Sequence, residues 1–248
     1  MSSRPLLFVR LLLALAVALP LASPHVARAA EPALAPFGAV GSPAQAPWHV
    51  VGLPQQTKPF TRFSVVDVDG KRAVKIEADE SYGNLVHPLK ANAPAHLAWQ
   101  WRVEQPIEAA DLHQKSGDDN AVKVCVFFDL PIESISFTDR QLLRLARGKT
   151  SELVPAATVC YVWDAHLAVG TTLDNAFTRR QRYMVLESGA DKLGRWVGER
   201  RDLGADFTKL FGDESPTVPM ILGVAVGADA DNTKSHSVSY VSGVILEP

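Results

Sequence analysis

The chain has 248 residues, which is enough to bury a full hydrophobic core as one large domain. Its 25 Lys and Arg residues are outnumbered by 27 Asp and Glu residues. A phosphate backbone repels such a chain unless basic residues cluster, and the only basic cluster is Arg179, Arg180 and Arg182, so no nucleic acid partner is expected.

The first 29 residues have the pattern of a cleaved secretory signal. Arg4 and Arg10 precede an apolar run, residues 11–19, which is too short to cross a bilayer as a helix. Ala27 and Ala29 occupy the two positions that signal peptidase inspects, so cleavage is expected after Ala29. We therefore expect an exported protein, periplasmic or extracellular, with no transmembrane segment in its mature form. The loss of three arginines and no acids lowers the net charge from −2 to −5.

The mature chain is expected to begin with an extended arm and to continue as a series of strands. Residues 30–47 contain four prolines and two glycines, which excludes a helix or a central strand there. Residues 63–78 alternate apolar and polar side chains around an Asp-Val-Asp-Gly turn, which predicts a hairpin. No internal linker stands out, so residues 48–248 are expected to form a single β-sandwich domain. Further strands are expected at 97–103, 121–128, 158–163, 183–187, 195–200, 220–226 and 237–246.

Two short helices are expected among these strands. Thr138 begins a capping-box pattern ahead of an apolar stripe, which predicts a helix over 139–147 that ends at Gly148 in a left-handed conformation. Asp206 is expected to cap a second helix that ends at Gly212 and plugs one end of the β core. Many strands without alternating helices predict an all-β fold, an antiparallel β-sandwich or jelly roll with two short helices.

Several segments, taken in order, resemble an exported bacterial family of unknown function over roughly residues 45–248. They are LAWQWRV, SGDDNAVKVCVFF, TVCYVWD, DLGADFTKLFG and GVAVGADADNTKSHSVSYVSGV. Their order, with Tyr240 shortly before a Gly-Val-Ile ending, also resembles galactose-binding-like jelly rolls, the architecture of many carbohydrate-binding modules. The first resemblance implies no catalytic or binding residue, and the second implies a fold without a function.

Two acidic loops are the strongest site candidates. Residues 116–120 lead into one expected strand and residues 227–233 leave another, so a sandwich would gather both loops. Their hard oxygen donors suit a structural Ca²⁺, which takes roughly six to eight oxygen ligands. The alternative is turn chemistry, in which Asp and Asn side chains bond to nearby backbone amides. The proposed ligands are Asp118, Asp119, Asp229, Asp231 and Asn232.

Tryptophan side chains offer a second kind of site. Trp48 follows the proline-rich arm and Trp196 stands among charged residues, so both are expected to be partly exposed and able to stack on a ligand. Trp99 and Trp101 share one face of a strand with apolar neighbours, which favours packing in the core.

The sequence leaves enzymatic activity open, because it lacks the nucleophile-elbow, zinc-protease, P-loop and dinucleotide-binding motifs. Our leading hypothesis is a non-catalytic module that binds a carbohydrate or a similar envelope polymer. The alternative is an envelope glycan hydrolase, which needs two carboxyls roughly 5–10 Å apart. A third is an interaction partner with a flat apolar patch. The carboxylates considered for hydrolysis are Glu77, Asp79, Glu80, Asp129, Asp164 and Glu187.

Cys125 and Cys160 are the only cysteines. Alternation places them on the Lys123 face and the Thr158 face of their strands, so their sulfurs could meet if the strands are neighbours. An oxidising compartment favours such a disulfide, and two separate thiols are the alternative.

Overall fold

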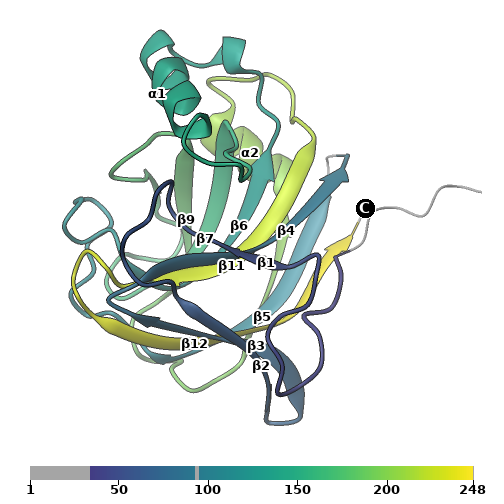
Figure 1. Cartoon of the computed structure of the whole chain (residues 1–248), viewed down its shortest axis with the longest axis vertical. Coiled ribbons are helices and arrows are strands. Elements are labelled where there is room, and N and C mark those ends of the chain that lie inside the picture. Colours follow the sequence, from purple (N-terminus) through teal and green to yellow (C-terminus); the bar gives the residue numbers. More distant parts are fainter. Residues whose placement is uncertain (1–33, 93–94, 248) are drawn as a thin grey trace, which may run out of the picture. The chain divides into compact units, whose positions relative to one another are not determined.

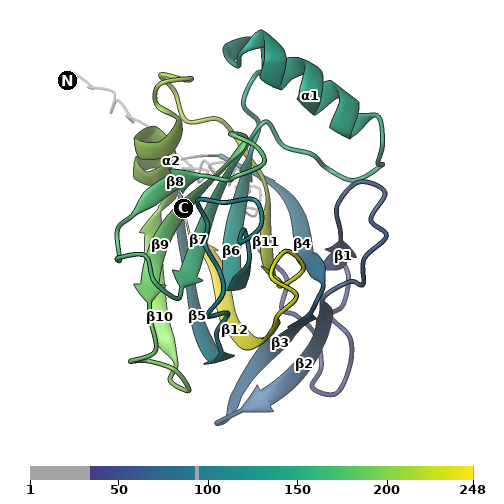
Figure 2. The same ribbon diagram turned by 90° about the vertical axis from the view of Figure 1, so that its left-hand side faces the viewer.

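The computed structural model describes residues 34–92 and 95–247 as two packed β-sheets with short helices at one end (Figures 1 and 2). The seven-stranded sheet has the order β1 (His49–Val51), β4 (Tyr82–Ala91), β11 (Ile221–Asp229), β6 (Asn120–Phe128), β7 (Ala157–Asp164), β9 (Gln181–Ser188) and β8 (Thr172–Asp174). The five-stranded sheet has the order β10 (Val197–Asp202), β5 (His96–Gln105), β12 (His236–Glu247), β3 (Lys71–Asp79) and β2 (Arg62–Val68). The prediction of an all-β sandwich with two short helices is confirmed.

The two sheets enclose a core built from the alternating inward side chains of their strands. Trp99 and Trp101 on β5 are buried there, with ring centroids 5.5 Å apart, and Trp99 also packs against Tyr161 of β7. Their predicted place in the core is confirmed. The hairpin predicted over 63–78 is present as β2 and β3, paired from Arg62 opposite Glu77 to Val68 opposite Lys71.

One pair of neighbouring strands departs from the antiparallel expectation. β7 and β9 run parallel, because residues 165–180 carry the chain through β8 and back before β9 begins. Parallel neighbours need a crossover connection of roughly a dozen residues or more, and this segment supplies it.

Both helices lie at the same end of the sandwich (Figures 1 and 2). α2 (Leu203–Phe211) inserts Phe207 and Phe211 into the core, so the predicted plug is present. α1 (Phe137–Arg147), which follows the single-turn η1 (Ile132–Ser134), buries only Leu143. No helix among the residues described here is long and apolar enough to cross a membrane.

The helix caps differ from those predicted. Ser136, rather than Thr138, caps α1 by accepting a hydrogen bond from the backbone N–H of Asp139 at 3.1 Å. Asp202 caps α2 in the same way, and Asp206 is buried inside the helix. A cap residue has a non-helical backbone, so it must precede the first residue of its helix. Thr138 and Asp206 lie inside α1 and α2 and therefore cannot cap them. Gly148 has a right-handed φ of −72°, so it does not adopt the predicted left-handed conformation, whereas the second helix ends at Gly212 as predicted.

Three strands have no counterpart in the sequence expectation, namely β1, β4 and β8. β4 is a central strand between β1 and β11, yet it contains Pro88, which cannot donate to a ladder. The pairing register of β4 with β11 shifts between Ile221 and Gly223, next to Pro88, and this irregularity accommodates the proline.

Candidate functional site

Two hollows lie side by side over the outer face of the seven-stranded sheet, the face turned away from the five-stranded sheet. We call the first the polar cleft, which has a volume of about 520 Å³. Its lining consists of Leu53, Pro54, Gln55, Gln56, Thr57, Lys58, Tyr82, Asp118, Asn175, Phe177, Thr178, Gln181, Asp229, Asp231 and Asn232. We call the second the apolar groove, which also measures about 520 Å³. Its apolar lining consists of Val51, Leu53, Pro54, Val86, Pro88, Phe127, Leu142, Leu143, Ala146, Leu153, Val154, Pro155 and Phe177.

A buried ion pair lies beneath the polar cleft. Lys123 Nζ on β6 donates to Asp229 Oδ2 on β11 at 2.9 Å and lies 4.8 Å from the ring centroid of Tyr82 on β4. Burial raises the pKa of Asp229 to about 7, against the opposing effect of the Lys123 charge. Burial alone would lower the pKa of Lys123, but the charge and hydrogen bond of Asp229, together with Tyr82 and Asp118, more than offset burial and raise that pKa. The pair therefore keeps Lys123 protonated under the cleft floor.

The second buried carboxylate of the floor, Asp118, is held by a hydrogen-bond network. Tyr183 OH donates to Asp118 Oδ1 at 3.1 Å, and Asn175 Nδ2 donates to Asp118 Oδ2. Tyr183 OH in turn accepts hydrogen bonds from Asn175 and Gln181, each at 2.9 Å. Burial raises the pKa of Asp118 and, by a larger effect, that of Tyr183. These contacts join β9 to the segment before β6 and make the floor rigid.

Two loops form the walls of the polar cleft. The loop after β1 is pinned by Gln56, whose Nε2 donates to the carbonyl oxygen of Tyr82 at 2.9 Å and whose Oε1 accepts from the N–H of Leu53. Lys58 of the same loop pairs with Asp231 at 2.7 Å. The opposite loop, between β8 and β9, is turned by Asn175, whose Oδ1 accepts from two backbone amides. This turn leaves Phe177 55% exposed beside the cleft.

Gly227 allows β11 and the side chain of Asn84 to approach closely in one part of the cleft floor. Asn84 on β4 lies against Gly227 on β11, where an added Cβ would overlap Asn84 Oδ1 and the carbonyl of Gly83. The close approach keeps Asn84 Nδ2 3.0 Å from Tyr82 OH and so orients the tyrosine under the cleft.

The acidic loops converge as expected, but their charges are met from within the protein. Asp119 accepts from Thr233 N at 2.7 Å and Oγ1 at 2.6 Å and from Asn232 N at 3.2 Å, so it closes the loop between β11 and β12. Asp229 pairs with Lys123 and Asp231 with Lys58. No group of three or more His, Cys, Asp or Glu side chains within the described ranges is arranged to hold a metal ion.

In the structure, each of the four carboxylates proposed as calcium ligands, Asp118, Asp119, Asp229 and Asp231, has a partner within the protein. Buried carboxylates need a positive or hydrogen-bonding partner, and here Lys123, Lys58, Tyr183 and Thr233 supply it. The donor set therefore does not fit Ca²⁺.

Neither predicted tryptophan lines the polar cleft or the apolar groove. Trp48 is 3% exposed, because the arm folds over it: Phe37 packs 4.7 Å from its ring, and its Nε1 donates to the carbonyl of Ala35 at 2.7 Å. Its predicted exposure is wrong.

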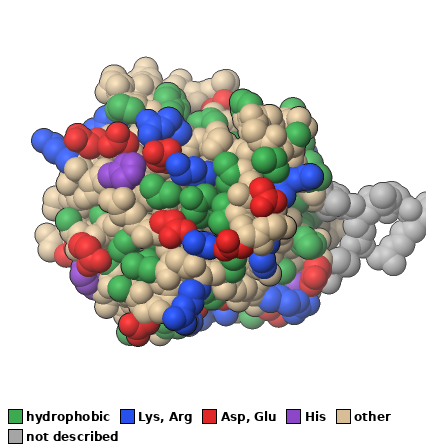
Figure 3. Space-filling model, turned by 90° about the horizontal axis from the view of Figure 1, so that it is seen from below, with side chains coloured by type: hydrophobic (Ala, Val, Ile, Leu, Met, Phe, Trp, Pro, Cys, Tyr) green, Lys and Arg blue, Asp and Glu red, His purple; other side chains and the backbone are tan. Residues whose placement is uncertain are grey.

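Trp196 is half-buried against Tyr240 of β12, with Lys71 5.6 Å from its ring. Figure 3 views the molecule from the side of β12, β3 and β2, where charged side chains of both signs surround small apolar areas.

Cys125 and Cys160 are directly opposite each other on β6 and β7 and form a disulfide. Of the two alternatives left open by the sequence, the structure contains the bridge. It lies on the outer face of the seven-stranded sheet, in a second apolar cluster with Val86, Val185 and Ala225. This cluster supports the sheet beneath the apolar groove.

None of the six carboxylates considered for hydrolysis lines the polar cleft or the apolar groove. Glu77 pairs with Arg62 and Lys75, Asp164 accepts from the amides of His166 and Leu167, and Glu187 pairs with Lys192.

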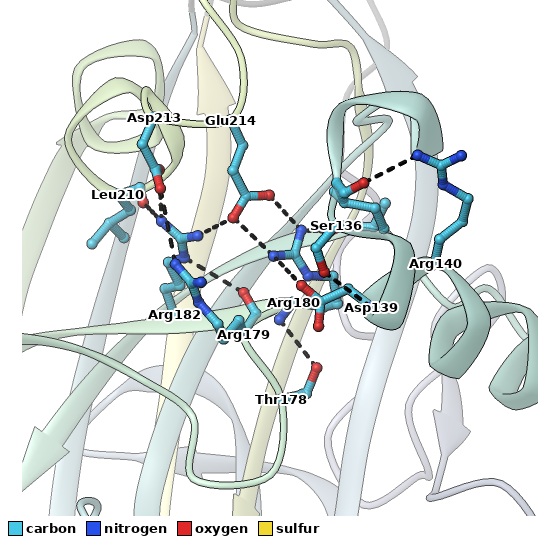
Figure 4. A network of polar contacts seen from close by, with 12 residues as sticks. Ser136, Asp139, Arg140, Thr178, Arg179, Arg180, Arg182, Leu210, Asp213 and Glu214 are labelled. Atoms are coloured by element: carbon cyan, nitrogen blue, oxygen red, sulfur yellow. Dashed lines mark hydrogen bonds and ion pairs between the residues drawn. The ribbon is translucent and has the colours of Figure 1, made fainter.

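The basic cluster is neutralised by neighbouring acids (Figure 4). Arg180 makes a two-pronged contact with Glu214 at 2.6 and 2.8 Å, and Arg182 bonds to Glu214 and, at 3.0 Å, to Asp213. Arg179 pairs with Asp174 at 3.1 Å. These arginines therefore tie β9 to the segment after α2 and do not form a free basic patch.

Comparison with known proteins places most of the chain in one family. Residues 46–245 match the family model described as "Protein of unknown function (DUF3047)". The chain belongs to this family. The DUF3047 match spans β1 through most of β12 and so includes the floor and both walls of the polar cleft. None of the curated proteins matches the chain.

Of the residues that line this DUF3047 site, the sequence expectation named only Asp118, Asp229, Asp231 and Asn232, and it also missed Lys123 beneath the floor. Lys123 carried the one usable signal, because it interrupts the apolar strand AVKVCVFF. A lysine at the centre of such a strand is rarely buried without an acidic partner.

Proposed function

We propose that this protein is an exported, non-catalytic module that binds a carbohydrate, or a similar hydroxyl-rich envelope polymer, in the polar cleft. The observation that carries the proposal is the side-chain chemistry of the cleft, where the amides of Gln55 and Gln181 lie in one lining with the rings of Tyr82 and Phe177. Amides both donate and accept hydrogen bonds, as sugar hydroxyls do. Aromatic rings offer flat apolar faces to the C–H faces of a sugar ring.

The hydrolase alternative receives less support from the same cleft. Asp118 and Asp229 are both in its lining, and burial raises the pKa of each. However, both oxygens of each carboxylate already accept a hydrogen bond from the protein, from Tyr183, Asn175, Asn120 and Lys123. A general acid or a nucleophile needs a free oxygen directed at the substrate.

The test is binding of purified protein to an array of envelope glycans, followed by titration calorimetry on those retained. Phe177→Ala should weaken binding about tenfold, as expected for the loss of an aromatic contact worth about 1.4 kcal/mol. Phe137→Ala is the matched control, because Phe137 is 72% exposed and lines neither hollow. The bound glycan should be recovered uncleaved.

Two results would contradict the proposal. The first is that no glycan is retained. The second is that Phe177→Ala and Phe137→Ala bind alike while Trp196→Ala loses binding, which would move the site to the outer face of the five-stranded sheet. Release of reducing ends that stops in Asp118→Asn would favour the hydrolase instead.

A further inference from the structure

The apolar groove exposes an unusual concentration of large apolar side chains. Leu142 of α1 is 59% exposed, Leu153 in the segment before β7 is 42% exposed, and Leu53 after β1 is 47% exposed. All three line this one groove. A contiguous exposed apolar surface on a soluble domain marks a place where apolar material binds.

The groove and the polar cleft adjoin each other. The residues that line both are Leu53, Pro54, Tyr82, Phe177, Thr178 and Gln181. A molecule that occupies both hollows would therefore cross Tyr82 and Phe177 at their junction.

The charged side chains at the rim of the groove are already paired. His49 Nε2 and Glu152 Oε2 are 3.1 Å apart, and they join β1 to the segment that precedes β7. Arg180 is held by Glu214 and lies 3.4 Å from Asp139, as Figure 4 shows. Each of these ionisable side chains at the rim thus already has a polar partner, which suits uncharged hydrocarbon better than a charged peptide or headgroup.

α1 supplies one side of this hollow. It contributes Leu142, Leu143 and Ala146 to the lining, while the strands contribute Val86 and Phe127 from the opposite side. Figure 2 shows α1 beyond the ends of β4 and β1. A groove with two walls and a floor encloses a chain of methylenes better than a flat protein surface.

We propose that the ligand of this protein is an amphiphile, whose hydroxyl-rich headgroup lies in the polar cleft and whose alkyl chain lies in the apolar groove. The headgroup assignment rests on the proposed function, and the alkyl chain rests on the groove and the lining residues that it shares with the cleft. The ligand class is therefore a glycolipid or another acylated sugar.

The test uses n-alkyl maltosides with 8, 10 and 12 carbons, each below its critical micelle concentration, and maltose as the chain-free ligand. Each buried methylene strengthens hydrocarbon binding about fourfold, so affinity should rise about 16-fold for every two carbons. Leu142→Gln and Leu153→Gln should remove most of this dependence on chain length. Leu145→Gln is the matched control, because Leu145 lies on the same helix, is 58% exposed and lines neither hollow.

Different failures identify different errors. The alkyl-chain inference is overturned if the affinity for the maltosides does not depend on the length of the alkyl chain. It is also overturned if that affinity falls equally in Leu145→Gln and Leu142→Gln. Either result leaves the proposed function standing. Equal binding of dodecyl maltoside and dodecylphosphocholine overturns the sugar headgroup, and with it the proposed function, while the groove remains a hydrocarbon site. Circular dichroism of each variant establishes that it is folded.

Discussion

At the scale of single residues, the Lys123–Asp229 pair is the most sensitive part of the molecule. Both side chains are at least 95% buried, and they join strands that are 106 residues apart in the sequence. Removal of one partner leaves an uncompensated charge in the interior, which costs about 3–5 kcal/mol. Replacement of both by uncharged side chains of similar volume removes that charge and often changes the free energy of unfolding very little.

We therefore predict that Lys123→Met lowers the free energy of unfolding by about 3–5 kcal/mol, and that Lys123→Met with Asp229→Asn recovers most of the loss. Urea unfolding of the two single variants and the double variant measures this coupling. A double variant no more stable than Lys123→Met alone would show that the stability lost in Lys123→Met does not come from the unpaired charge of Asp229.

The pH dependence of the same variants gives a second readout. The folded pKa of Asp229, about 7, is above its ordinary value of 3.8, so folding favours the protonated carboxyl. This contribution to stability is complete below pH ~4 and is lost as pH rises through ~7. Without the Lys123 charge that pKa rises further. The free energy of unfolding should therefore fall more steeply between pH 4 and 8 in Lys123→Met than in the wild type, and Asp229→Asn should lose this contribution.

At the scale of the elements, the two acidic loops are predicted to be independent of calcium. Their carboxylates are paired with Lys123 and Lys58 or bonded to Thr233, so a cation would have to displace these partners. Thermal melts in EDTA and in millimolar Ca²⁺ should have the same midpoint. A midpoint several degrees higher in Ca²⁺, abolished by Asp231→Ala, would restore the calcium site.

The disulfide links two central strands, β6 and β7, and closes a sequence separation of 35 residues. In the chain-entropy account, closing a loop of this size stabilises the fold by about 4 kcal/mol. Cys125→Ser with Cys160→Ser should therefore lower the free energy of unfolding by roughly that amount. The reduced wild type should behave like the double variant. Thiol labelling of unreduced, denatured protein that modified both cysteines would exclude the bridge.

At the scale of the whole molecule, export is the prediction that concerns residues outside the described part of the chain. The signal predicted over residues 1–29 should be absent from the mature protein, which should begin at Ala30 or Glu31. Intact mass of protein recovered from the periplasm or the medium measures this. A full-length N-terminus there would contradict the predicted cleavage after Ala29, and recovery of the protein only from the cytoplasm would contradict export.

The sequence by itself determined the local features of this protein. Side chains alternate across a strand with a period of two, so the hairpin over 63–78, the strands around Trp99 and Trp101 and the faces of both cysteines followed from neighbouring residues alone. Helix positions were recovered within a few residues, although Ser136 and Asp202 replaced the expected caps.

Only the tertiary structure decided where those elements meet. Trp48 is buried because the arm packs over it and because the ring of His87 on β4 lies 5.0 Å from its own ring. No pattern in the neighbouring sequence predicts these contacts. The polar cleft depends on strand order, which brings Tyr82, Lys123 and Asp229 together from three strands, and on two loops that face each other across the sheet. Periodicity states which face of a strand is buried, whereas the charge that neutralises a buried carboxylate is set by which strand lies beside it.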